Sequence, residues 1–94
     1  DDFLMSYAVD GFSMAMDFRV TDENRQRVVW LARELDDTVI GAGGRFYFAK
    51  DSTLRPETAE AFLGEERITR FRELKRRCDP DGILETDLWR RVFG

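Results

Sequence analysis

The chain has 94 residues, of which 43% are hydrophobic, a composition that supports a single domain with a modest core. Its 19 acidic and 15 basic residues give a net charge of −4, which provides no general attraction to nucleic acid or to anionic lipid. The single cysteine, Cys78, excludes an internal disulfide, and without histidine or a second cysteine the usual zinc sites are excluded too. We therefore expect no metal site.

The hydropathy pattern contains no apolar run near the ~20 residues that a membrane helix needs. No charged-then-apolar leader opens the chain either. We expect a soluble protein without a membrane span, located in the cytoplasm. Because Asp1-Asp2 leads directly into an apolar run without an initiating methionine, we also expect a fragment of a longer protein.

Two apolar runs near the start are separated by Asp10-Gly11. An Asp-Gly pair in that position is the strongest short signal for a β-hairpin. The second run alternates large apolar side chains with small or polar ones, so one face is expected in the core. That face comprises Phe12, Met14, Met16, Phe18 and Val20. The other face is either solvent-exposed or, because Ser13 and Ala15 are small, leaves room for a bound molecule.

A helix is predicted from about Asp22 to Ile40, with Thr21 as its N-cap. Gly41 is the expected terminator. The apolar stripe at spacings of three and four comprises Val28, Leu31, Ala32, Leu35 and Val39. Trp30 lies off this stripe, as is typical of a partly covered surface residue or of a position where a further segment packs.

Residues 43–52, Gly-Gly-Arg-Phe-Tyr-Phe-Ala-Lys-Asp-Ser, combine a glycine pair, an apolar strand and a lysine at the expected end of that strand. The glycines permit backbone angles and close approaches that a Cβ would forbid. The aromatic run predicts a strand fixed in the core. Lys50 is therefore the best single candidate for a functional residue. The alternative is that the glycines form only a turn and that the lysine is solvated.

Three helices are predicted after this stretch. The first begins at Pro56 and ends before Gly64, the second spans residues 65–78, and the third spans residues 88–92 after a cap at Thr86-Asp87. The basic residues of the second helix are interpreted as a solvated face, because no aromatic or glycine-rich element accompanies them. The expected class is α+β, with antiparallel strands packed against helices.

The pattern of residues 43–52 resembles the carboxyl end of FAD-linked oxidoreductases of the vanillyl-alcohol oxidase type, most closely the decaprenylphosphoryl ribose oxidase branch. The resemblance covers nearly the whole chain in the same order, from Gly11-Phe12 to residues 86–91. It implies a fragment of a two-domain FAD-linked oxidase fold. Residues 1–42 would end the substrate (cap) domain, and residues 43–94 would form the carboxyl tail that returns to the FAD-binding domain.

The resemblance also implies FAD as cofactor and hydride transfer between a substrate alcohol carbon and flavin N5. By resemblance, Tyr47 contacts FAD and Lys50 lies beside the flavin ring and the substrate, so Lys50 is both catalytic and cofactor-binding. Ser13 and Ala15 would face the substrate. A cysteine commonly occupies the position of Ala15 in the closest relatives, so the substrate stays open.

Geometry adds a constraint to this assignment. In a fully extended strand Tyr47 points away from the face that Phe48 and Lys50 share. Both Tyr47 and Lys50 can reach one flavin only if the chain turns between Phe48 and Lys50. We therefore expect the strand to stop by Ala49.

Two alternatives remain at this stage. One is an FAD-dependent reductase of a carbon–carbon double bond, since similar motifs occur in the sterol reductase branch. The other is a non-catalytic α+β domain that binds a ligand or a partner. On the oxidoreductase reading, the partners are a small-molecule substrate and the remainder of the protein's own two domains. The isolated 94 residues are expected to be inactive and to self-associate through unpaired sheet edges and Trp30.

Overall fold

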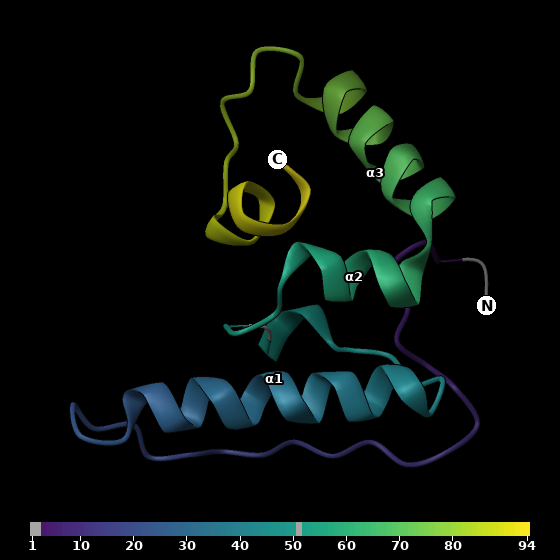
Figure 1. Ribbon diagram of the computed structural model, residues 1–94. Coiled ribbons are helices and arrows are strands. Elements are labelled where there is room, and N and C mark those ends of the chain that lie inside the picture. The colour runs from purple at the N-terminus through teal and green to yellow at the C-terminus, as the bar shows by residue number, and fades with distance from the viewer. Residues whose placement is uncertain (1–2, 51) are drawn as a thin grey trace.

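The computed structural model describes residues 3–50 and 52–94 as helices joined by turns and extended segments (Figure 1). The elements in chain order are α1 (Arg25–Gly41), the 3₁₀ turn η1 (Phe48–Lys50), α2 (Pro56–Leu63), α3 (Glu65–Cys78) and the short π-helix η2 (Trp89–Phe93). Helix α2 contacts α1, α3 and η2. It is therefore the element around which the others pack.

The expected α+β class is wrong, because the described residues contain helices and turns but no strand. Residues 3–9 do not pair with residues 12–20 across Asp10-Gly11. Instead Met5 packs against the core, and the carbonyl of Ser6 accepts a hydrogen bond from Arg45. A two-stranded hairpin is marginal on its own, and contacts with the carboxyl half replace the strand pairing.

The apolar face expected in the core is exposed. Phe12 is fully exposed, and the other four side chains of this face, Met14, Met16, Phe18 and Val20, are between 47% and 77% exposed. In Figure 1 the segment that carries them runs along α1 on the side away from α2. Alternation creates an apolar face, but burial requires a second layer, and the described part of the chain provides none over this face.

Helix α1 begins three residues later than expected, after a turn over residues 22–24. Thr21 and Asn24 form a reciprocal pair: Thr21 Oγ1 accepts from the Asn24 N–H at 3.2 Å, and Asn24 Oδ1 accepts from the Thr21 N–H at 2.7 Å. This is the arrangement of a capping box with asparagine at the fourth position. The predicted stripe is half-buried, and Trp30 lies off it with 63% exposure, as expected.

The carboxyl half follows its predicted elements closely. Helix α2 begins at Pro56 and ends before Gly64, whose φ of 84° suits glycine. Helix α3 has the expected bounds. Thr86 Oγ1 accepts from the Trp89 N–H at 3.1 Å and caps the last helix, which is wider than an α-helix because the Gly94 N–H bonds to the Trp89 carbonyl.

The core lies in the carboxyl half. Its buried apolar members are Leu54, Ala59, Leu63, Ile68, Val92 and Phe93. Phe93 is the centre of an aromatic cluster, with its ring centroid 4.9 Å from that of Phe71 and 5.7 Å from that of Phe48. The cluster therefore joins η2 and α3 to the stretch that carries the candidate site.

Candidate functional site

The three consecutive aromatic residues 46–48 differ in their burial. The rings of Phe46 and Phe48 lie 5.2 and 5.6 Å from that of Phe62 on α2, and both side chains are partly buried. Tyr47, which lies between them in the sequence, is 53% exposed. The predicted strand is absent from this described stretch, and Tyr47 differs from its two neighbours in being exposed. Phe46 and Phe48 are therefore held against α2, while the ring of Tyr47 stays accessible to a ligand.

The chain turns at η1, as expected between Phe48 and Lys50. The Lys50 N–H donates to the Tyr47 carbonyl oxygen at 3.0 Å, and Lys50 is exposed. Tyr47 and Lys50 are thus the first and last residues of one hydrogen-bonded turn. The structure brings these two predicted site residues together, while their contact with FAD stays a prediction.

The glycine pair before this turn has two separate structural roles. Gly43 has a φ of 74°, which places it in the left-handed region. The Gly43 N–H bonds to the Ile40 carbonyl at 3.0 Å and the Gly44 N–H to the Val39 carbonyl at 2.8 Å, the pattern of a Schellman motif. Gly43, two residues beyond the predicted Gly41, is therefore the residue that reverses the chain after α1.

Gly44 permits a close approach to α1. A Cβ on Gly44 would lie 2.6 Å from Val39 Cγ1 and 3.1 Å from the Val39 carbonyl oxygen. No ordinary side chain fits at that distance. The predicted requirement for glycine is confirmed at both positions, by backbone angle at Gly43 and by space at Gly44.

The amino-terminal segment reaches the same stretch through contacts that the sequence did not reveal. Arg45 Nη1 donates to the Ser6 carbonyl oxygen at 3.2 Å. The next residue, Tyr7, has its ring centroid 5.0 Å from that of Tyr47, at an angle of 42°. These contacts join residues about 40 positions apart and have no local sequence signal. They add a second partly exposed ring beside Tyr47.

Ser13 and Ala15 lie in the extended segment and are exposed. That segment passes α1 on the side away from α2, whereas η1 follows α1 on the side that faces α2 (Figure 1). The structure therefore does not bring these two predicted substrate residues to the turn that carries Tyr47 and Lys50. Their role stays a prediction.

An apolar cavity of about 320 Å³ lies beside the aromatic cluster, lined by Met5, Phe48, Phe71, Lys75, Leu84, Thr86, Leu88, Trp89 and Phe93. The Lys75 ammonium lies 5.3 Å from the centroid of the Trp89 ring and forms an ion pair with Asp79. Asp79 also accepts the backbone N–H groups of Ile83 and Leu84, each at 2.9 Å. The cation at this cavity is therefore already paired.

The bond from Lys75, together with the N–H groups of Leu84 and Ile83, lowers the pKa of Asp79. The carboxylate joins the end of α3 to the loop that precedes η2. It therefore connects Lys75 with Leu84, two residues that line the cavity.

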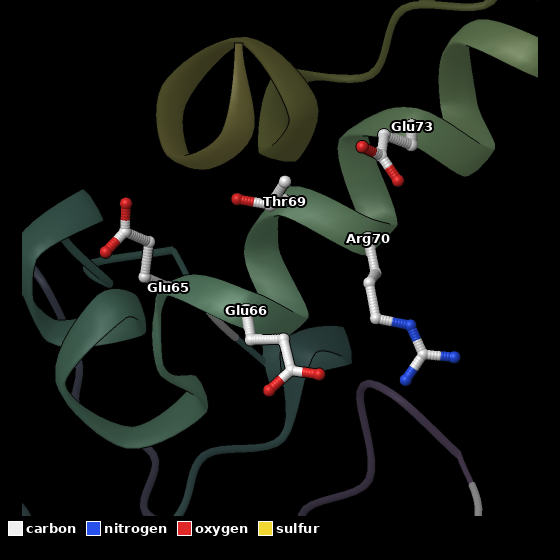
Figure 2. Close-up of a pocket in the computed structure, with 5 residues that line it drawn as sticks. All are labelled: Glu65, Glu66, Thr69, Arg70 and Glu73. Carbon is white, nitrogen blue, oxygen red and sulfur yellow. The ribbon is translucent and has the colours of Figure 1, made fainter.

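A shallow hollow lies along α3, and Figure 2 shows the side chains that line it: Glu65, Glu66, Thr69, Arg70 and Glu73. All five come from one helix and point in different directions. The carboxylate of Glu66 and the guanidinium of Arg70 are not within ion-pair distance, although their spacing favours a pair. The hollow lacks convergent groups, so we do not assign it a function.

The described residues, 3–50 and 52–94, contain no group of three or more metal-ligating side chains that could hold an ion. None of their helices has the length and apolarity required to cross a membrane.

Comparison with known proteins finds similarity to an oxidase. The chain is 34% identical over 88 residues to decaprenylphosphoryl-beta-D-ribose oxidase of Mycolicibacterium smegmatis, a match that covers 94% of this chain and 18% of that protein. It is 42% identical over 62 residues to an uncharacterized protein in the mprA 5′ region of Streptomyces coelicolor, covering 66% of this chain and 16% of the relative. The chain thus spans less than a fifth of either relative. No family model and no solved structure match it.

Proposed function

We propose that this chain is the carboxyl-terminal portion of an FAD-dependent oxidoreductase that transfers hydride between a substrate alcohol carbon and flavin N5. The observation that carries the proposal is the similarity to an oxidase over 94% of the chain, which includes the stretch from Gly43 to Lys50. The geometry supports it, because Tyr47 and Lys50 are both exposed at the ends of one turn. An accessible aromatic ring and an accessible cation three residues apart suit a planar ring system that becomes negatively charged.

Bound FAD would supply the hydride acceptor. Lys50 would hold a positive charge where negative charge develops on the flavin, near N1 and the C2 carbonyl. Tyr47 would contact the cofactor with its exposed ring or its hydroxyl group. The chain has no phosphate-binding glycine loop, so the pyrophosphate would be held by the remainder of the protein, and the isolated 94 residues would be inactive.

The remaining assignments belong to the same proposal. Residues 1–42 would end the substrate domain, and residues 43–94 would form the tail on the FAD-binding domain. Ser13 and Ala15 would face the substrate once that domain is complete. The partners would be a small-molecule substrate and the protein's own two domains, and the location would be the cytoplasm.

The test uses the complete gene product that contains these residues. We expect it to purify with the visible absorbance of a bound flavin. Lys50→Ala should retain that absorbance and the fold but lower kcat by about 100-fold, the usual cost of removing one preorganised electrostatic group. Arg70→Ala, an exposed cation on α3, is the matched control and should retain full turnover. A colourless protein, or parental turnover in Lys50→Ala, would disprove the assignment.

A set of candidate substrates distinguishes hydride transfer from an alcohol to the flavin from hydride transfer from the flavin to a carbon–carbon double bond. Anaerobic mixing with alcohols, including a lipid-phosphate-linked ribose, should bleach the flavin absorbance if the protein oxidises an alcohol carbon. Bleaching by a reduced nicotinamide nucleotide, which supplies the hydride, followed by recovery of the absorbance on adding an alkene, would instead identify a reductase of carbon–carbon double bonds.

A further inference from the structure

We propose that Arg91, on the carboxyl-terminal helix η2, is the positioning residue for Lys50. Arg91 Nη1 donates to the Ser52 carbonyl oxygen at 3.3 Å and to the Leu54 carbonyl oxygen at 3.0 Å. Its Nε lies 3.5 Å from Asp87 Oδ2 in an ion pair on the same helix. The guanidinium therefore holds two carbonyls just beyond Lys50, and this role rests on the proposed function of Lys50.

The loop that Arg91 contacts is anchored in the core at its far end. Leu54 is only 4% exposed, whereas Ser52 is exposed. A guanidinium is suited to this position, because its planar fork has several donors in a fixed geometry and stays charged at every working pH. Hydrogen bonds from a charged donor are also about twice as strong as neutral ones. Leu54 is fixed by its burial, and the bond from Arg91 to the Ser52 carbonyl also holds the backbone two residues after Lys50.

The same helix also holds the chain on the other side of Lys50. Phe48, the first residue of η1, has its ring centroid 5.7 Å from that of Phe93 on η2. Helix η2 therefore contacts the chain two residues before Lys50, through a ring, and two and four residues after it, through Arg91. An exposed lysine has a long and mobile side chain, so a fixed backbone on both sides is what its placement requires.

The first experiment measures the backbone near Lys50, with no reference to activity. In the complete gene product, Arg91→Gln should increase the hydrogen-exchange rate of the Lys50 amide, which donates to the Tyr47 carbonyl, by about tenfold, because the two charge-assisted hydrogen bonds that hold the following backbone are lost. Arg90→Gln is the control, because Arg90 is exposed on the same helix and its guanidinium lies 3.8 Å from Glu85 in an exposed ion pair. The control should exchange at the parental rate. Equal rates in Arg91→Gln and the parent would overturn the proposal.

The second experiment connects Arg91 to Lys50. Arg91→Gln should lower kcat by about tenfold without changing KM, and Arg91→Lys, which keeps the charge, should recover part of the loss. In a Lys50→Ala background, Arg91→Gln should have no further effect on kcat. An additive loss in the double variant would show a general structural role instead.

The two experiments also separate the failure of each proposal. Full activity in Lys50→Ala would disprove the function proposed for Lys50 but leave the exchange result valid as a statement about the loop. If both Arg91 variants had the same amide hydrogen-exchange rate and the same kcat as the parent, the positioning role would be disproved. Lys50 would remain the candidate catalytic residue.

Discussion

The backbone N–H of Lys50 donates to the carbonyl oxygen of Tyr47 at 3.0 Å, which closes a single turn between the two exposed residues of the candidate site. In an extended strand these two side chains would lie on opposite faces. A 3₁₀ turn at Phe48–Lys50 replaces that extended backbone, and the rings of Phe46 and Phe48 pack beside Phe62 at its start. The packing of Phe46 and Phe48 thus leaves Tyr47 as the accessible ring among these three residues.

The first prediction concerns the close approach at Gly44. Gly44→Ala should lower the free energy of unfolding by about 1–3 kcal/mol, because its Cβ would lie 2.6 Å from Val39 Cγ1 and force α1 away from the following chain. Chemical denaturation measures this change. Adding Val39→Ala should recover part of the loss, since it removes the contacting methyl group.

Gly41→Ala is the matched control. Gly41 is the last residue of α1, and a Cβ there has no heavy atom within 4 Å. This substitution should be neutral or stabilise the protein by about 0.5–1 kcal/mol, since alanine favours the helix. If Gly41→Ala and Gly44→Ala changed the stability equally, the cause would be chain entropy rather than the contact with Val39.

The sequence predicted the elements whose signals are local. Pro56 and Gly64 determine the bounds of α2, and Thr86 caps the last helix, because each acts through its own backbone angle or a hydrogen bond within three residues. The hairpin at Asp10-Gly11 was predicted wrongly. A strand requires a partner, and alternation in residues 12–20 cannot show whether a partner is present.

For the candidate site, too, the sequence predicted a local feature but not the long-range contacts. The turn at Lys50 was predicted because Tyr47 and Lys50, three positions apart, could not both reach one flavin from an extended strand. The contacts of Arg45 with Ser6, of Tyr7 with Tyr47 and of Arg91 with Leu54 join residues 37–40 positions apart. No periodicity or capping rule connects such distant positions, so only the structure reveals them.

The second prediction concerns Asp36, a buried carboxyl on α1. One of its oxygens, Oδ2, has no hydrogen-bond partner, and burial raises its pKa although Arg55 opposes the shift. Asp36→Asn should therefore raise the free energy of unfolding at pH 7 by about 1 kcal/mol, since it removes a charge that is costly to bury. Asp37→Asn is the control. It removes an exposed ion pair with Arg55 and should cost about 0.5 kcal/mol.

The pH dependence of the stability gained by Asp36→Asn tests whether the buried charge is its cause. A raised pKa means that the folded state binds the proton more tightly, so the penalty from ionised Asp36 disappears as the pH falls through its folded value. The advantage of Asp36→Asn should thus be largest at neutral pH and shrink on acidification toward pH 4. An advantage that stayed constant with pH would argue against burial of the charge as the cause.

The third prediction is that the isolated chain self-associates through its extended segment. The exposed face that includes Phe12 and Met14 has no covering layer among the described residues, and alternating apolar segments with free backbone groups pair with like segments. The sedimentation coefficient should rise with concentration. Phe12→Lys with Met14→Lys should suppress the rise, whereas Ser13→Lys, on the other face, should have a smaller effect. A parent chain that stayed monomeric at all concentrations would contradict this prediction.

The fourth prediction concerns Asp79, whose carboxylate bonds to Lys75 and to the N–H groups of Ile83 and Leu84. These bonds lower the pKa of Asp79, so their stabilisation is present above the unfolded value near 3.8 and is lost as the pH falls through the lower folded value. Asp79→Asn should melt at a lower temperature than the parent at pH 7, and the difference should shrink only below about pH 4. Asp81→Asn, at an exposed position of the same turn, should melt at the same temperature as the parent. A melting difference for Asp79→Asn that persisted at about pH 2 would mean that shape, not the ionised carboxylate, holds the loop against α3.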